Sequence, residues 1–175
     1  FNLFLGKVFN SKAKETCELT LSTNGNAPMY VHLTGIVTEN GEQCLVTAID
    51  ITERKQAEKE LIQSEQRYRF IFETAPDIIY TLAADSGRIT SLNPAIETVT
   101  GWSHDKLIGK PFEFLIHPED LQLAKETFEQ AIRGEHPPAY ELRILTKSGE
   151  YVFGEFKSLP HFDGGKIIGE FGFAR

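Results

Sequence analysis

An internal repeat constrains the fold of this chain more than any other feature. Residues 17–33, CELTLSTNGNAPMYVHL, share the pattern of residues 140–156, YELRILTKSGEYVFGEF, and each segment leads through a glycine-containing turn to a final strand-like segment. A repeat of this kind indicates that one supersecondary unit occurs twice. We therefore expect two related units, of which the first lacks its beginning.

Both copies of the repeat have the pattern of half-buried β-strands. Residues 16–22 alternate polar and apolar side chains, which is typical of a strand with one buried face. Asn24-Gly25 and Asn40-Gly41 predict the hairpin turns of the first unit. Further strands are predicted over residues 27–37, 42–50, 139–146, 150–160 and 166–174, and residues 77–93 are predicted to form a β-hairpin with its turn at Asp85-Ser86-Gly87.

A long charged helix is predicted between the two units. Its positions Ala57, Leu61, Ser64, Tyr68 and Ile71 are four, three, four and three residues apart, which is the a/d spacing of a coiled coil. Most other positions are Glu, Lys, Arg or Gln, so this helix cannot be buried on all sides. Two interpretations stay open: the seam pairs with a second copy of the chain, or the helix is a solvated spacer.

Two further helices are predicted within the second unit. Asn93-Pro94 predicts the start of a short helix, with the asparagine as its cap and the proline in its first turn. A longer amphipathic helix is predicted from Pro118 to Gly134. The second unit therefore combines β-strands with helices that are inserted between them.

Charge and cysteine content argue against several functions. The net charge is −7, and acidic and basic residues are interspersed, whereas a nucleic-acid-binding surface needs clustered Lys and Arg. No apolar run approaches the roughly 20 residues that cross a bilayer, so we expect a cytoplasmic segment without membrane contact. Cys17 and Cys44 are the only cysteines, and no His/Cys cluster has the spacing of a metal site.

Several motifs occur in one order along the second half of the chain. They are SEQRYRFIFETAPDIIYTL, GRITSLNPAIETVTGW, LIGKPFEFLIHPED, YELRILTKSGEYVFGEF and GGKIIGEFGFAR, with DITERK at residues 50–55 before them. With these motifs the sequence resembles the PAS family with its C-terminal PAC motif. The resemblance covers residues 66–175 and is specific because the pieces occur together and in order.

The resemblance implies an α+β fold and a division of the chain. A PAS domain has a five-stranded antiparallel sheet in the order 2-1-5-4-3, with short helices and one long helix over its concave face. Residues 1–51 are expected to be the C-terminal part of a first PAS unit, residues 52–75 a connecting signalling helix, and residues 76–175 a nearly complete second PAS domain. The first unit then lacks two strands and the short helices.

The resemblance also implies a role in signalling. PAS units of this kind occur in multidomain sensors, most often in two-component sensor histidine kinases, so both ends of this sequence are expected to lie inside a larger protein. The partners are then a second copy of the chain, the neighbouring sensor and output modules, and a small-molecule ligand. The alternative is a ligand-free scaffold for dimerisation and signal relay. No phosphoacceptor or ATP-binding segment of a kinase is found, so we do not expect an enzyme.

In this family a ligand lies between the sheet and the helices. The candidates for its pocket are apolar or aromatic residues of the second unit: Tyr80, Val99, Trp102, Leu107, Phe112, Phe114, Leu115, Phe128, Leu142, Ile144 and Phe153. The same side chains can instead fill a dry core, because apolar residues close-pack without a guest. Tyr80 and Trp102 are the most informative positions, since each has a polar group that needs a partner when it is buried.

Two cofactors known from this family require residues that the chain does not place suitably. Covalent flavin chemistry needs a cysteine in the loop after the short helices, and residues 108–120 contain none. Haem needs an axial ligand, usually histidine, whereas only His117 and His136 flank the long helix. His117 is expected to cap the helix start instead. The ligand is left open, and we expect a colourless protein.

Asp50, Ile51 and Thr52 are the candidates for signal relay. In the family pattern the aspartate fastens the start of the connecting helix to the edge of the sheet, and Thr52 is positioned to cap that helix. These three residues therefore join the last strand of the first unit to the helix that follows it.

Charged residues in the second unit are expected to be at the surface. Glu119 and Asp120 lie in the first turn of the long helix, where the helix dipole favours acidic side chains. Glu141 and Arg143 lie two residues apart on one face of a strand, so they are expected to pair with each other or across the sheet, as an exposed cross-strand charge pair. A catalytic role for the acidic pair is not expected, because neighbouring residues of a helical turn point apart.

Overall fold

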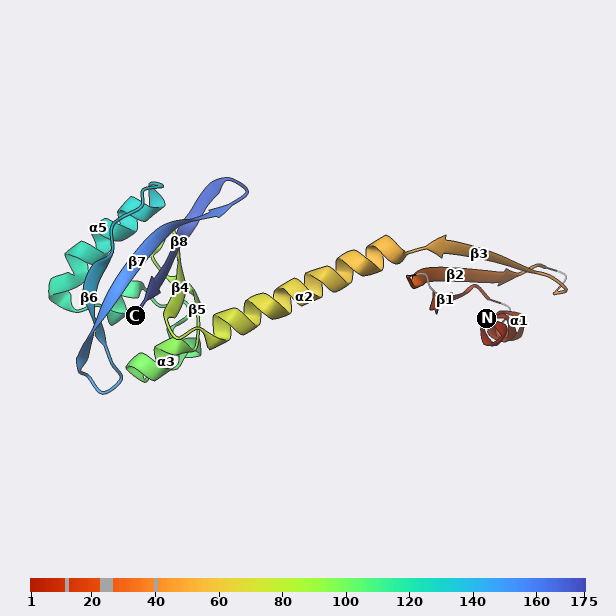
Figure 1. Ribbon diagram of the computed structural model, residues 1–175, viewed down its shortest axis with the longest axis horizontal. Helices are drawn as coiled ribbons and strands as arrows, with labels where there is room; N and C mark the ends of the chain where they lie inside the picture. Colours follow the sequence, from red (N-terminus) through yellow and green to blue (C-terminus); the bar gives the residue numbers. More distant parts are fainter. Residues whose placement is uncertain (12, 23–26, 40) are drawn as a thin grey trace. The chain divides into compact units, whose positions relative to one another are not determined.

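The structure, a computed structural model, describes residues 1–11, 13–22, 27–39 and 41–175. It divides into two compact units, Phe1–Gln66 and Arg67–Arg175 (Figure 1). The predicted turn residues Asn24, Gly25 and Asn40 lie outside the described residues. Gly41 is described, and it has a φ of 76°, a conformation that glycine adopts without a steric penalty.

The first unit is a three-stranded antiparallel sheet with one helix. The sheet has the order β1-β2-β3. Phe4 and Val8 of the helix pack against Val31 and Leu33 of the central strand, and these residues form a small core. The elements are α1 (Asn2–Ser11), β1 (Glu15–Leu21), β2 (Met29–Val37) and β3 (Cys44–Asp50).

The connecting helix α2 (Thr52–Thr74) begins directly after β3. The Asp50 side chain accepts a hydrogen bond from the backbone N–H of Thr52 at 2.8 Å, which satisfies an amide of the first turn. The Thr52 hydroxyl accepts from the backbone N–H of Tyr30 in β2 at 2.9 Å, and Ile51 is buried. The predicted roles are thus exchanged: Asp50 caps the helix, and Thr52 fastens it to the sheet, because its hydroxyl faces the free amide of Tyr30.

The second unit has a five-stranded antiparallel sheet in the order β5-β4-β8-β7-β6. Numbered within the unit, this order is 2-1-5-4-3, so the predicted fold is confirmed. The last three strands pair along most of their length. The strands are β4 (Ile78–Ala83), β5 (Ile89–Leu92), β6 (Tyr140–Leu145), β7 (Tyr151–Asp163) and β8 (Lys166–Ala174).

Short helices and one longer helix cover one face of this sheet (Figure 1). The predicted long helix from Pro118 begins as a short 3₁₀ turn before it becomes α-helical. Within the described residues, no helix is both long enough and apolar enough to cross a membrane. The helical elements are α3 (Ala95–Thr100), α4 (His104–Leu107), η1 (Phe112–Leu115), η2 (Pro118–Asp120) and α5 (Leu121–Ile132).

Asn93 does not cap α3, which begins after Pro94 without a side-chain cap. Its side chain is 0% exposed, and its Oδ1 accepts from the backbone N–H of Ile79 at 2.9 Å. Its Nδ2 donates to the carbonyl oxygens of Phe72 at 3.1 Å and Asp77 at 3.0 Å. The predicted cap is therefore wrong, because three backbone groups of α2, of β4 and of the segment between them take up the hydrogen bonds of this amide.

Candidate ligand-binding site

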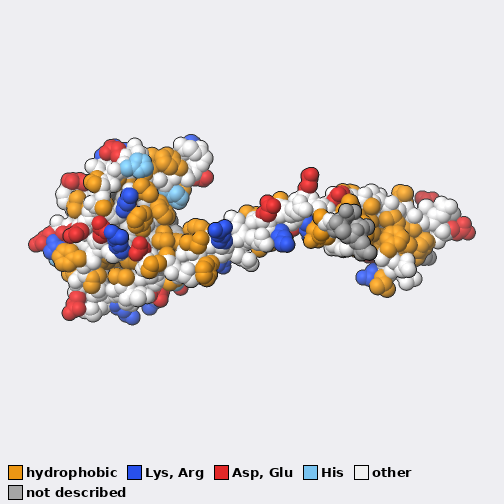
Figure 2. Space-filling view, in the orientation of Figure 1, with side chains coloured by type: hydrophobic (Ala, Val, Ile, Leu, Met, Phe, Trp, Pro, Cys, Tyr) orange, Lys and Arg blue, Asp and Glu red, His pale blue; other side chains and the backbone are white. Residues whose placement is uncertain are grey.

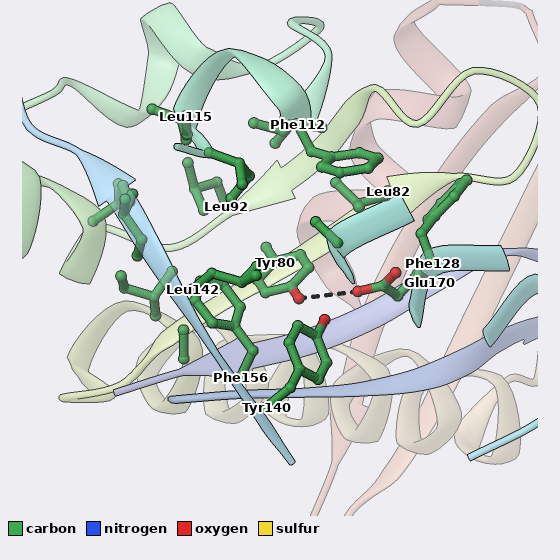
Figure 3. A pocket seen from close by; sticks show the side chains of 17 residues that line it. Tyr80, Leu82, Leu92, Phe112, Leu115, Phe128, Tyr140, Leu142, Phe156 and Glu170 are labelled. Carbon is green, nitrogen blue, oxygen red and sulfur yellow. Dashed lines mark hydrogen bonds between the residues drawn. The ribbon is translucent and has the colours of Figure 1, made fainter. Parts of the chain in front are cut away.

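A cavity of about 70 Å³ lies between the sheet and the helices of the second unit. Its walls are mainly aliphatic and aromatic side chains from all five strands and from α3, η1 and α5, which Figure 3 draws as sticks. The cavity lies where the resemblance implied that a ligand would bind.

Six of the predicted pocket residues line this cavity. They come from one strand at the centre of the sheet, from the edge strand β6 and from the covering helices: Tyr80, Phe112, Leu115, Phe128, Leu142 and Ile144. Their side chains meet there because alternate residues of a strand point to the same face. The structure therefore brings together six of the eleven predicted residues.

The other five predicted residues lie elsewhere. Phe153 is 75% exposed, since β7 turns Phe156 toward the cavity and residues of the other parity toward the outer face. Val99 and Phe114 are exposed on the outer sides of α3 and η1. Leu107 is fully buried but packs in the core without reaching the cavity.

Trp102 is the fifth of these residues, and its polar partner lies outside the cavity. Its indole N–H donates to the carbonyl oxygen of Leu145 at 3.1 Å. Its ring packs edge-to-face on Phe114 with the centroids 5.5 Å apart, and the Lys110 ammonium lies 4.2 Å from the Phe114 ring centroid. Trp102 therefore joins the segment after α3 to the end of β6 and is not a pocket residue.

A chain of hydrogen bonds crosses four strands at the wall of the cavity. The Tyr80 hydroxyl of β4 donates to Oε1 of Glu170 in β8 at 2.9 Å, and Ser158 of β7 donates to the same oxygen at 2.6 Å. The Tyr140 hydroxyl of β6 lies 2.6 Å from the Ser158 oxygen. Figure 3 shows the Tyr80 and Tyr140 hydroxyl groups turned toward Glu170, which is 2% exposed.

Burial raises the pKa values of the titratable groups in this chain of hydrogen bonds. It raises the pKa of Glu170, against the effect of the hydrogen bonds from Ser158 and Tyr80. Burial and the nearby charge of Glu170 also raise the pKa of Tyr80 and of Tyr140. The two tyrosines are thus neutral hydrogen-bond donors, and Glu170 is the one carboxyl group among the residues that line the cavity.

The sequence interpretation missed Glu170, Ser158 and Tyr140. One signal was available, because the residues at positions 170, 172 and 174 of the last strand share the face on which the strand is buried. A glutamate on that face must be buried, and a buried carboxyl group needs hydrogen-bond partners. Which partners it has depends on the neighbouring strands.

Arg143 forms a second polar cluster, at the start of α5. Its guanidinium group donates to Asp120 at 2.9 and 2.6 Å and to Glu119 at 2.9 Å. These hydrogen bonds lower the pKa of Asp120 to about 2. The predicted pairing of Arg143, with Glu141 or across the sheet, is wrong, since Arg143 pairs with η2 instead. His117 accepts from the backbone N–H of Glu119 at 3.2 Å, which confirms its predicted capping role.

The cavity offers few groups for the cofactors that the family suggests. Neither cysteine nor histidine is among the residues that line it. Cys17 and Cys44 are free, half-buried thiols of the first unit. The lining thus supplies no thiol for a flavin adduct and no imidazole for haem iron, and the absence of both cofactors stays a prediction.

Comparisons with known proteins agree with this architecture. A family model described as the PAS fold matches residues 66–175, and a second one, described as a PAS domain, matches residues 1–53. A curated relative, an uncharacterized protein of Sinorhizobium fredii, is 28% identical over 104 residues, which are 59% of this chain and 12% of that protein. The chain therefore spans about an eighth of the length of this relative.

Two crystal structures show the same fold. The PAS domain of a protein from Colwellia psychrerythraea is 26% identical, with a TM-score of 0.57 over 63% of this chain and 93% of that one. A domain of the sensory box sensor histidine kinase/response regulator from Geobacter sulfurreducens is also 26% identical, with a TM-score of 0.55 over 66% and 96% of the two chains. With the family match over more than half of its residues, the chain belongs to the PAS family.

Proposed function

We propose that this chain is a sensory segment of a multidomain sensor of the histidine kinase type, in which the cavity of the second unit binds a small molecule. The hydrogen-bonded Glu170 at the cavity wall is the observation that supports this proposal. A dry apolar core gains nothing from a buried carboxyl group, whose burial costs free energy. Apolar walls with a few converging polar groups are typical of ligand sites.

A ligand in this cavity contacts the elements that carry a signal. The walls include the central strands β4 and β8 and the covering helix α5. A molecule that binds one packing of these elements more tightly than another shifts their equilibrium. The segment needs no catalysis for this role, so we propose that it is not itself an enzyme and that it acts in the cytoplasm on neighbouring modules of its protein.

Native mass spectrometry of the purified chain tests whether the cavity binds a small molecule. We expect an additional bound mass on the wild-type protein and its loss in Ala124→Leu, because Ala124 lines the cavity and the larger side chain fills it. Gln122→Leu, which adds the same side chain on the exposed side of α5, is the control and keeps the bound mass. A wild-type protein without bound mass would favour the ligand-free scaffold.

The surface of α2 supports a second role, in dimerisation. None of its 23 residues is buried, and Leu61 and Tyr68 of the predicted seam are 69% and 64% exposed. Figure 2 shows acidic and basic side chains interspersed along α2, with apolar side chains between them. Because an exposed apolar row at heptad spacing loses contact with water when two helices pair, we propose that this seam, which also includes Ala57 and Ile71, forms a homodimer.

Substitution within the seam tests the dimer. Leu61→Lys places a charge at a core position of the pair and is expected to raise the dimer dissociation constant at least about tenfold, as measured by sedimentation equilibrium. Gln63→Lys adds the same charge to α2 outside the seam and is expected to leave the constant unchanged. A monomeric wild-type protein, or equal effects of the two substitutions, would contradict the proposed seam.

A further inference from the structure

The chain of hydrogen bonds at the cavity wall, which ends on Glu170, indicates the class of ligand that the cavity binds. We propose that the cavity takes a small organic cation, an ammonium or amidinium group on a short apolar body, with Glu170 as its counter-ion. This inference rests on the proposed function, because it names the class of molecule that the cavity of the second unit binds.

The hydrogen bonds around Glu170 converge on one oxygen of its carboxyl group. Tyr80 and Ser158 both donate to Oε1, so Ser158 has no proton left for Tyr140 and must accept one from it. Three hydroxyl protons thus point along these hydrogen bonds toward Glu170, and this arrangement favours the charged form of the carboxyl group against the burial that raises its pKa. Among the described residues none donates to Oε2, and that oxygen is open to a donor that the protein does not supply.

Among the described residues, no basic side chain acts as a counter-ion to Glu170. The residues that line the cavity include no lysine, arginine or histidine. The titratable groups that face Glu170 are Tyr80 from β4 and, through Ser158, Tyr140 from β6, and both are neutral because their pKa values are raised. The parts of η1 and α5 that line the cavity contribute apolar side chains. A bound cation offsets the cost of the buried charge, whereas a neutral or anionic guest does not.

Aromatic rings form much of the remaining wall. Phe112 and Phe128 pack with their centroids 5.4 Å apart, and Tyr140 stacks on Phe156 at 5.8 Å. The electron-rich face of an aromatic ring attracts a cation, and proteins recognise organic ammonium groups with several such rings. Rings and a single carboxylate together therefore complement an organic cation better than a metal ion, which needs several oxygen or nitrogen ligands.

The size of the cavity limits the length of this cation. Its volume of about 70 Å³ is several times the space that one water molecule needs. It is well below the about 300–1,000 Å³ that sites for drug-sized ligands enclose. A head group with a few carbon atoms fits this space, and a longer chain requires the helices to move.

Titration with three molecules of similar size and different charge tests the inference. The probes are 1-propylammonium, 1-propanol and propionate, and amide chemical shifts of the ¹⁵N-labelled full chain report binding. We expect 1-propylammonium to bind at least about tenfold more tightly than 1-propanol. Glu170→Gln, which keeps an oxygen for Tyr80 and Ser158, is expected to lose this preference, and the exposed control Glu141→Gln is expected to keep it.

The outcomes separate this inference from the proposed function. Binding of 1-propanol or propionate as tight as that of the cation overturns the ligand class and leaves the cavity as a small-molecule site. Failure of all three probes to shift the amides around the cavity overturns both proposals. Should Glu170→Gln not fold, the wild-type protein is titrated at falling pH. Protonation of Glu170 is expected to weaken cation binding alone, and an unchanged preference overturns the role of Glu170.

Discussion

Replacing Asn93 with alanine is expected to destabilise the second unit by about 3 kcal/mol, because it leaves three half-buried backbone groups without their partner. The amide accepts from Ile79 and donates to Phe72 and Asp77, and it is fully buried. Urea unfolding followed by the fluorescence of Trp102, the single tryptophan, measures this change in the unit that contains the substitution.

Two controls make this result specific. Asn10→Ala removes an exposed asparagine from α1 of the first unit and is expected to leave the Trp102 transition unchanged. Asn93→Asp keeps the acceptor for Ile79 but turns a second oxygen toward the carbonyl groups of Phe72 and Asp77, so it is expected not to restore stability. A loss below about 1 kcal/mol for Asn93→Ala would show that water replaces the amide.

Asn93 also connects the connecting helix to the cavity wall. Phe72 lies in the last part of α2, and Ile79 directly precedes Tyr80, whose hydroxyl binds Glu170. A change at the cavity that moves β4 therefore alters the hydrogen bonds at the end of α2. This is a physical connection between the candidate ligand site and the helix, and comparing ligand affinity in wild-type protein and Asn93→Asp tests whether the two are coupled.

The fold was predictable because its signals are local and repeated. Alternating residues and turn residues predict the strands, whereas the strand order of the sheet follows from the resemblance to the PAS family, which rests on the order of the motifs. The errors occur where one side chain has a choice of partners. Asn93 has a residue type that suits a helix cap, and Arg143 has Glu141 two residues away, but tertiary contacts offer each of them more hydrogen bonds.

The candidate site was predictable only in its apolar half. Residues such as Leu142 and Phe128 follow from hydrophobic periodicity, whereas the face on which Phe153 lies depends on strand parity, and the sequence interpretation assigned that parity wrongly. The polar half joins residues from β4, β6, β7 and β8, and only the pairing of strands brings these together. Because these residues lie far apart in the sequence, the sequence alone did not predict the chain of hydrogen bonds that gives the cavity its carboxyl and hydroxyl groups.

Gly172→Ala is expected to destabilise the second unit by about 3 kcal/mol, because the added methyl group overlaps the ring of Tyr80. Gly172 is paired with Tyr80 on one side and with Ser158 on the other. The absence of a side chain lets the Tyr80 ring lie across β8, where its hydroxyl reaches Glu170. The substitution is therefore expected to displace Tyr80 and break its hydrogen bond as well.

A double-mutant cycle separates this steric effect from the general cost of replacing a glycine in a strand. Tyr80→Leu removes the ring, so Gly172→Ala is expected to cost less than about 1 kcal/mol in that background, again from urea unfolding followed by Trp102. Tyr80→Phe removes only the hydroxyl and keeps most of the overlap, so the cost of Gly172→Ala is expected to stay close to that in wild-type protein. Equal costs in all three backgrounds would mean that β8 shifts to accept the methyl group, and the position of Tyr80 would then not depend on Gly172.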